Sequence, residues 1–260
     1  MINVSSSVGI VIIKSFLTLV FIFISHYVQA EDFKLTIYTE HFSPYNFESK
    51  AGQLVGINLD IVKDVCFASD IICEFKILPW KRAYSLVQKE KHSGIISIAK
   101  TSQRTPIFNW VGPLASSETF FYKLKKNTQL KMNSLNEAKQ FSLAIVRGDI
   151  YESIVKKVGF EAGKNLLSIG DEKQYMHLFL NSKIDLILGS EYTIGYQLSP
   201  FGYSEDDVVR LQELPIPEIA GNYIAFNKSV PNYIVARFNS EYEKLKRKDN
   251  FSAYKKRYKR

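Results

Sequence analysis

The chain has 260 residues, of which 46% are hydrophobic and 23% charged, and its formal net charge is +8. These proportions are typical of a folded globular protein and exclude a disordered chain, and the sequence has no low-complexity segment or internal repeat. The four histidines form no spacing pattern for catalysis or metal binding, so we predict no enzyme activity, no metal and no cofactor.

The amino terminus has the three parts of a secretory signal peptide. Lys14 precedes an apolar run over residues 16–24, and Val28-Gln29-Ala30 forms a small-residue cleavage site. An uncleaved membrane anchor is the alternative, but the apolar run is shorter than the roughly 20 residues that a spanning helix needs. We therefore predict that residues 1–30 are a cleaved signal peptide and that the protein is exported.

The first part of the predicted mature chain alternates strand and helix patterns. Strand patterns cover residues 33–38, 74–78 and 94–99, a helical pattern covers 59–66, and a second helix begins at Pro79. This order predicts a parallel α/β sheet with right-handed crossovers. Ligands on such sheets bind beyond the carboxyl ends of the strands. The residues that fall there are Glu40, Phe42, Trp80, Ser97 and Arg104.

Arginine and aromatic residues alternate over residues 78–113. Trp80 and Arg82 lie near the start of a predicted helix, and Arg104 precedes the aromatic segment 108–110. An arginine fork binds a carboxylate through two hydrogen bonds, and aromatic faces supply a desolvated wall for the rest of a small molecule. The pattern therefore predicts a recognition pocket rather than a catalytic constellation.

Two cysteines, Cys66 and Cys73, are the only ones in the chain. In an exported protein this even count favours a disulfide, and no histidine cluster or second cysteine pair supports a metal site. The spacing also differs from the CxxC spacing of redox motifs. We expect the disulfide to join the end of a helix to the start of the next strand.

A second unit repeats the α/β order. Strand patterns cover residues 141–146, 166–169 and 184–188, and helical patterns begin at Gly148-Asp149 and cover 175–180. Two extended segments, 120–124 and 220–226, connect the two units, and a long final helix is predicted over residues 232–246. Two crossings predict a hinge with a cleft between two lobes. The predicted boundaries are 1–30 for the signal peptide, 31–121 and 223–260 for the first lobe, and 122–222 for the second.

The carboxyl terminus is strongly basic, with nine Lys and Arg residues between residues 244 and 260. The same segment has an apolar stripe, formed by Tyr242, Leu245, Phe251, Tyr254 and Tyr258. Two interpretations stay open: amphipathic helices with a solvated basic face, or docking onto an acidic partner at a membrane. Because the protein is exported, we expect no nucleic-acid partner.

Several motifs together resemble the family 3 extracellular solute-binding proteins, the periplasmic amino-acid-binding components of ABC importers. The similarity extends from about Leu35 to Tyr258. Its motifs are the segments 52–60, 101–104, 146–149, 183–187 and 251–254. The resemblance implies a two-lobed α/β fold of the type II periplasmic binding protein class, with mainly parallel sheets flanked by helices and with two hinge strands. The two cysteines also occupy positions where some members carry a disulfide.

The resemblance implies roles for residues of the first lobe. Arg104 matches the arginine that clamps the ligand's α-carboxylate, and Phe42 matches the aromatic residue that stacks on the ligand. Trp80 matches the lining of the side-chain pocket, Ser97 a contact at a strand end, and Glu40 an acidic position that meets a cationic side chain in some members. Apart from Ser97, each of these residues also has a structural alternative, either core packing or surface exposure. Separately, the pair of Trp80 and Arg82 suggests a bulky or doubly anionic ligand.

The second lobe contributes fewer candidate residues. Gly148 and Asp149 place backbone N–H groups at a helix amino terminus, which suits an anion, and Asp149 can also cap that helix. Many amino-acid binders carry an aspartate for the ligand's ammonium at the position of Ser190. A serine cannot neutralise an ammonium, so either Glu191 or Glu40 takes that task, or the ligand is not an ordinary α-amino acid.

The resemblance implies a function for the whole chain. We expect a monomeric periplasmic protein that binds a small carboxylate-bearing solute and delivers it to the permease of an ABC importer. Two alternatives stay open: the delivery of the ligand to a membrane sensor, and an enzyme of the cyclohexadienyl dehydratase type on the same fold.

Overall fold

The computed structural model describes residues 33–115, 118–147, 149–170, 172–215, 221–249 and 251–259. Residues 34–260 form one compact unit. The predicted signal peptide and Gly148 lie outside the described residues. No helix within the described ranges is both long and apolar enough to cross a membrane.

The first lobe contains a five-stranded sheet in the order β4-β1-β5-β12-β6. β1 pairs in parallel with β4 and β5, whereas β12 pairs antiparallel with β5 and β6. A strand from the last part of the chain is therefore inserted into the first sheet. The strands are β1 (Lys34–Thr39), β4 (Ile72–Ile77), β5 (Ser93–Ala99), β6 (Phe108–Val111) and β12 (Asn222–Asn227), with a separate ribbon of β2 (Phe47–Glu48) and β3 (Leu54–Val55).

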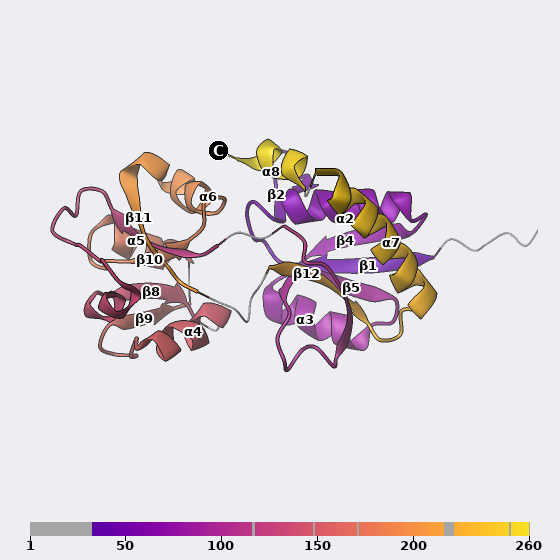
Figure 1. The fold of residues 1–260 in the computed structure, drawn as a ribbon, viewed down its shortest axis with the longest axis horizontal. Helices are drawn as coiled ribbons and strands as arrows, with labels where there is room; N and C mark the ends of the chain where they lie inside the picture. Colours follow the sequence, from indigo (N-terminus) through magenta and orange to yellow (C-terminus); the bar gives the residue numbers. More distant parts are fainter. Residues whose placement is uncertain are drawn as a thin grey trace, which may run out of the picture. The chain divides into compact units, whose positions relative to one another are not determined.

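Helices cover both faces of this sheet, with α2 and α7 on one face and α3 on the other (Figure 1). They are α2 (Ile57–Ala68), α3 (Trp80–Lys89), α7 (Asn232–Asp249) and α8 (Ser252–Tyr258), which packs on α2. The final helix was predicted over residues 232–246. The structure extends it to Asp249 and adds α8 after a turn at Phe251, whose φ is +64°.

Gly56 determines how α2 begins. Its φ of +139° is unfavourable for residues with a side chain, and an added Cβ would lie 2.4 Å from the Tyr45 carbonyl oxygen. The close approach allows the carbonyls of Pro44 and Tyr45 to accept hydrogen bonds from the first backbone amides of α2. These contacts fix the loop over residues 40–46 against the helix.

The second lobe contains a three-stranded antiparallel sheet and a parallel pair of strands. The sheet has the order β10-β7-β11, with β7 (Phe120–Leu124), β10 (Ile187–Gly189) and β11 (Val208–Glu213); the pair is β8 (Leu143–Val146) and β9 (Leu166–Ile169). The helices are α4 (Ile150–Val158), α5 (Glu172–Leu180) and α6 (Ile194–Leu198), with 3-10 turns at Leu135–Gln140, Ser199–Phe201 and Glu205–Asp207. β11 was not predicted from the sequence, because Arg210 and Gln212 interrupt its apolar pattern.

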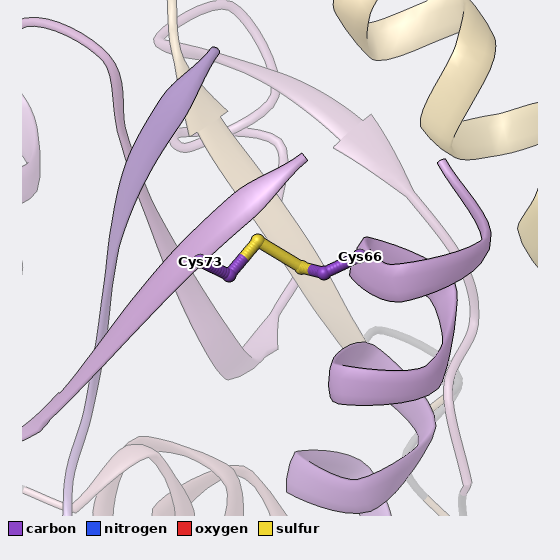
Figure 2. The surroundings of a disulfide bond; sticks show 2 residues. All are labelled: Cys66 and Cys73. Carbon is purple, nitrogen blue, oxygen red and sulfur yellow. A yellow bond between two sulfur atoms is a disulfide. The ribbon is translucent and has the colours of Figure 1, made fainter. Parts of the chain in front are cut away.

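A disulfide joins Cys66 near the end of α2 to Cys73 in β4, as Figure 2 shows. The sequence separation is seven residues, and Cys66 is buried in the core. The link therefore holds the helix end against the strand that follows it, as the sequence predicted.

Replacing both cysteines by alanine should lower the free energy of unfolding by about 2 to 3 kcal/mol, because the unfolded chain regains the entropy of a short loop. Urea unfolding with and without a thiol reductant measures this change. The wild type should lose stability on reduction, and the double variant should be insensitive. An equal response of both proteins to the reductant would contradict the expectation.

Hydroxyl and carboxylate groups fasten α8 to α2. The Tyr258 hydroxyl donates a hydrogen bond to Asp60 Oδ2 at 2.7 Å and accepts one from Gly56 N at 3.0 Å. The Tyr254 hydroxyl donates to Asp64 Oδ2 at 2.5 Å. Burial, together with the hydrogen bond to Asp60, raises the pKa of Tyr258 to about 12.

This raised pKa makes the α8 contact sensitive to alkaline pH. Because the unfolded phenol has a pKa of about 10, the stabilisation by the Tyr258 hydroxyl should be complete below pH 10 and should be lost as the pH rises through about 12. The difference in urea midpoint between wild type and Tyr258→Phe should therefore shrink between pH 9 and pH 11. A difference that stays constant or grows over this interval would contradict the assignment.

Candidate functional site

Arg104 is held in place by backbone and aromatic contacts. Its Nη1 donates a hydrogen bond to the carbonyl of Ala99 at 3.1 Å, and its Cζ lies 5.3 Å from the ring centroids of both Trp80 and Tyr84. The two rings stack with centroids 5.7 Å apart, and the arginine itself is half-buried. Its backbone amide is bound within the turn that begins at Thr101, at 3.1 Å from that residue's carbonyl oxygen. The guanidinium is thereby oriented before any ligand arrives.

The hydrogen bond to Ala99 occupies one of the five N–H donors of the guanidinium, and it is the only side-chain hydrogen bond of Arg104 among the described residues. Guanidinium groups favour stacking on aromatic faces because the ring quadrupole attracts the cation. The remaining donors suit a planar acceptor such as a carboxylate.

An aromatic row continues away from Trp80. Successive ring centroids lie 5.9 Å apart between Tyr84 and Phe108 and 5.8 Å apart between Phe108 and Trp110. Trp110 then meets Tyr223 of β12 at 6.0 Å. The row therefore connects α3, β6 and β12, and it ends at Tyr223, which pairs with Ile98 near the carboxyl end of β5.

Ser97 lies at a β-bulge in β5. Its neighbours Ile96 and Ile98 pair with Ile224 and Tyr223, which are adjacent in β12, so Ser97 has no partner in that strand. Its φ of +59° is in the left-handed region, which is uncommon for a residue other than glycine. The bulge turns this side chain into a polar network.

The network consists of buried amide groups around the Ser97 hydroxyl. That hydroxyl donates a hydrogen bond to Asn46 Oδ1 and accepts one from Asn58 Nδ2 at 3.0 Å. Asn46 Nδ2 donates to the Glu40 carbonyl at 2.7 Å, and Asn58 Oδ1 accepts from the backbone amide of Ala115 at 3.1 Å. Loop 40–46, α2, β5 and the chain leaving the first lobe therefore meet at one set of hydrogen bonds.

The segment around Ala115 is held from a second direction by β12. Asn222 Nδ2 donates a hydrogen bond to the Ala115 carbonyl at 3.3 Å, and the Leu114 amide donates to the Asn222 carbonyl at 2.6 Å. The two segments that cross toward the second lobe are thus bonded to each other, and the one that contains Ala115 is also bonded to Asn58.

The other predicted residues of the first lobe lie in separate contacts. Phe42 is half-buried, with its ring 5.0 Å from Tyr45, and Glu40 is also half-buried. Arg82 is exposed on α3. The structure therefore brings Trp80 together with Arg104, and Glu40 together with Ser97 through Asn46, while Arg82 belongs to neither group.

Asp149 caps α4, the structural role that the sequence allowed. Its Oδ1 accepts a hydrogen bond from the Tyr151 amide at 3.0 Å. Desolvation raises the pKa of Asp149 and outweighs the backbone hydrogen bonds, which lower it. The Tyr151 hydroxyl also bonds to the Thr119 hydroxyl at 2.9 Å, at the start of β7.

Ser190 is committed to a turn. It is buried, and its Oγ accepts hydrogen bonds from the amides of Tyr192 and Thr193 at 3.3 and 3.2 Å. Its backbone amide donates to Thr193 Oγ1 at 2.8 Å. Glu191 is exposed, and burial followed by the charge of Glu191 raises the pKa of Tyr192.

Sequence reasoning missed Asn46, Asn58 and Tyr84 as parts of the site. Asn58 carries the clearest signal, since it is a polar residue on the otherwise apolar buried face of α2. Asn46 carries none, because loop asparagines are common in turns.

Replacing Asn58 by alanine should lower the free energy of unfolding by about 2 to 3 kcal/mol, because the Ala115 amide and the Ser97 hydroxyl lose a buried partner. Urea unfolding of the variant tests this expectation. Asn239→Ala serves as the control, since Asn239 is exposed on α7. Equal stability of the two variants would show that the network does not stabilise the fold.

Residues 35–260 match the family model of the bacterial extracellular solute-binding proteins, family 3. The chain belongs to this family. Solved structures show the same two-lobed fold, among them an ancestral arginine-binding protein bound to arginine. That protein is 20% identical with a TM-score of 0.70, over 86% of this chain and 97% of its own.

Two further structures show the range of proteins with this fold. A Salmonella typhimurium periplasmic binding protein with high arginine specificity is 14% identical with a TM-score of 0.68, over 88% of this chain and all of its own. A histidine kinase sensor domain with similarity to periplasmic binding proteins is also 14% identical, with a TM-score of 0.71, over 88% of this chain and 97% of its own. At these identities, the likeness establishes the fold alone.

Proposed function

We propose that this protein captures a small carboxylate-bearing solute, an amino acid or a relative, and delivers it to the membrane permease of an ABC importer. The observation that carries the proposal is the placement of the Arg104 guanidinium, bonded to Ala99 and stacked on Trp80 and Tyr84. Membership of a solute-binding family supports the capture of a small molecule. The arginine-bound and arginine-specific proteins of the same fold support an amino acid as the solute.

The physical basis is preorganisation. Ordering a long side chain at the moment of binding costs about 0.5 to 1.5 kcal/mol, and here the Ala99 carbonyl and two rings have already restricted Arg104. A charge-assisted, bidentate hydrogen bond to a carboxylate then contributes fully to affinity. The rings of Trp80 and Tyr84 shield one side of the guanidinium from water, which strengthens its ion pair with the carboxylate.

We propose Glu40 rather than Glu191 as the acceptor of a ligand ammonium. The backbone of Glu40 is fixed by Asn46, in the network that also holds Ser97. Glu191 is exposed and interacts with Tyr192, and the Ser190 hydroxyl is used by its own turn. Phe42, two residues after Glu40, then supplies the ring that stacks on the ligand.

The second lobe completes the proposed site. We take residues 31–121 and 223–260 as the first lobe and 122–222 as the second, and we propose that Gly148 and Asp149 contact the ligand after closure. A solute held by Arg104 gains second-lobe contacts only in the closed form, so its binding shifts an open-to-closed equilibrium. A shift from mostly open to mostly closed needs about 5 kcal/mol of differential contact energy.

The proposed location follows from the family and the sequence. Family members are extracellular solute-binding proteins, and we propose that residues 1–30 direct this chain to the periplasm and are removed there. We further propose that the mature protein acts as a monomer and does not transform its ligand. Recovery of the bound solute unchanged by mass spectrometry is the outcome that a binding protein predicts and a dehydratase contradicts.

Thermal unfolding against a panel of solutes tests the ligand class. The panel contains L-arginine, other amino acids, dicarboxylates and a polyamine without a carboxylate. A true ligand at 100 times its dissociation constant should add about 2.7 kcal/mol of stability, roughly 5 to 10 °C for a protein of this size. Arg104→Ala should weaken binding of every carboxylate ligand about 10- to 100-fold, because a charge-assisted hydrogen bond is lost.

Two comparisons make this experiment specific. Arg237→Ala, which removes an exposed arginine paired with Asp70, should keep the full ligand shift. Glu40→Gln should weaken amino acids but not dicarboxylates, because only amino acids carry the ammonium. Undiminished shifts in Arg104→Ala, or a preference for the polyamine, would refute the carboxylate clamp.

A sensory role is the second candidate, supported by the histidine kinase sensor domain of similar fold. Cells that lack this protein distinguish the two roles. Loss of solute uptake supports delivery to a permease, whereas normal uptake with a lost transcriptional response supports delivery to a sensor.

A further inference from the structure

The positive charge of this protein is concentrated at its carboxyl end. Residues 241–260 hold nine of the 34 Lys and Arg residues but only three of the 26 Asp and Glu residues, and therefore six of the eight net positive charges. The described part of this segment forms the end of α7 and all of α8, drawn in yellow in Figure 1. The rest of the chain is nearly neutral.

The apolar stripe of this segment is used inside the fold. Tyr242, Phe251 and Tyr254 are buried, and the ring of Tyr242 lies 5.8 Å from that of Phe251 in a tilted arrangement. Tyr258 is held by Asp60. The aromatic residues therefore anchor the two helices to the first lobe. Most of the described basic side chains of the segment are exposed, whereas Lys246 and Lys255 are half-buried.

The acidic groups in this segment are largely occupied by local contacts. Asp249 accepts hydrogen bonds from the amides of Phe251 and Ala253, each at 3.0 Å, and so caps α8. Glu241 pairs with Lys244 at 2.6 Å. These carboxylates offset part of the charge but do not cover the outward face of α8.

Three lysines on that face surround one hollow. Lys255, Lys256 and Lys259 line a hollow of about 370 Å³ together with Tyr192, Asp249 and Ser252. Lys256 and Lys259 are exposed, and Lys255 is half-buried. Burial raises the pKa of Glu205, and the positive charge of Lys259 offsets part of this increase. Lys259 therefore has an acidic neighbour. No ion pair of Lys255 or Lys256 is found among the described residues.

The chemistry of Lys255, Lys256 and Lys259 favours a partner whose negative charge is spread over a surface. The lysine ammonium is a strongly hydrated point charge on a flexible stem, without the fork that gives arginine stereospecific contacts. Lysine is depleted at protein–protein interfaces, where aromatic residues and arginine dominate. Clusters of basic residues bind the anionic headgroups of a bilayer through charge density alone. The exposed Lys256 and Lys259 and the half-buried Lys255 therefore fit the surface of an anionic bilayer.

We propose that Lys255, Lys256 and Lys259 form a docking surface for an anionic phospholipid membrane. None of the three lysines is among the proposed solute-binding residues, and the docking requires no solute. By holding the protein near the bilayer, it confines the search for a membrane partner to two dimensions and raises the rate of encounter.

Vesicle cosedimentation tests the docking surface, with the chain from residue 31 onward, which contains the whole compact unit. Vesicles of phosphatidylglycerol and phosphatidylcholine are compared with vesicles of phosphatidylcholine alone. Each basic residue near an anionic surface strengthens binding about fivefold, so the triple variant Lys255→Gln, Lys256→Gln, Lys259→Gln should bind about 100-fold more weakly to the anionic vesicles. Binding should also weaken from low salt to about 0.15 M salt, because the charges are exposed.

The matched control replaces three exposed lysines elsewhere, Lys89→Gln, Lys91→Gln and Lys125→Gln, and has the same net charge. It should retain wild-type binding within about threefold. Loss of binding in the control to the same extent would overturn the proposal, because net charge alone would then explain the binding. Equal binding to both vesicle types, or no binding to either, would also overturn it and would favour an acidic protein partner.

The solute test remains separate. The α8 triple variant should keep the full thermal shift with any solute of the panel. Loss of vesicle binding with retained solute binding supports the docking surface, whereas loss of both would mean that the substitutions disrupt the fold and would contradict a dedicated surface.

Discussion

The carboxyl end of β5 is the point on which the proposed site depends. Within three residues it supplies the Ser97 hydroxyl, which joins loop 40–46 to α2, and the Ala99 carbonyl, which orients Arg104. The bulge opposite β12 turns Ser97 into the polar network. A change in the pairing of β5 with β12 would therefore move loop 40–46 and Arg104 together.

The same network relates the site to the crossing segments. Asn58 bonds to Ser97 with one atom of its amide group and to the Ala115 backbone with the other, and Asn222 holds Ala115 from β12. Buried polar groups cost free energy when they lose a partner, so the segment leaving the first lobe has a preferred position. The proposed ligand residue Ser97 is thus joined to the segment at Ala115 through a few hydrogen bonds.

Much of the first lobe was predictable from local pattern. Alternating residues in β1, the apolar run of β5 and the helical period of α2 each determine one element, and the cysteine count together with the compartment predicted the disulfide. The alternation of arginine and aromatic residues marked Arg104 and Trp80 as parts of one pocket, whereas the contact of Arg104 with Tyr84 was not predicted. The polar network was not predictable, because it joins Asn46, Asn58 and Ser97 from three segments, and no periodicity marks such long-range hydrogen bonds. In the second lobe, Arg210 and Gln212 concealed β11, and the turn that occupies Ser190 depends on the local hydroxyl of Thr193.

The central claim is that Arg104 binds the carboxylate of a small solute. A crystal structure of the protein grown with the tightest-binding solute of the panel tests it most directly. The account predicts two hydrogen bonds of about 2.7 to 2.9 Å from the Arg104 guanidinium to one carboxylate, with the guanidinium still against Trp80 and Tyr84. A solute whose carboxylate lies elsewhere, with Arg104 bound only to Ala99, would contradict it.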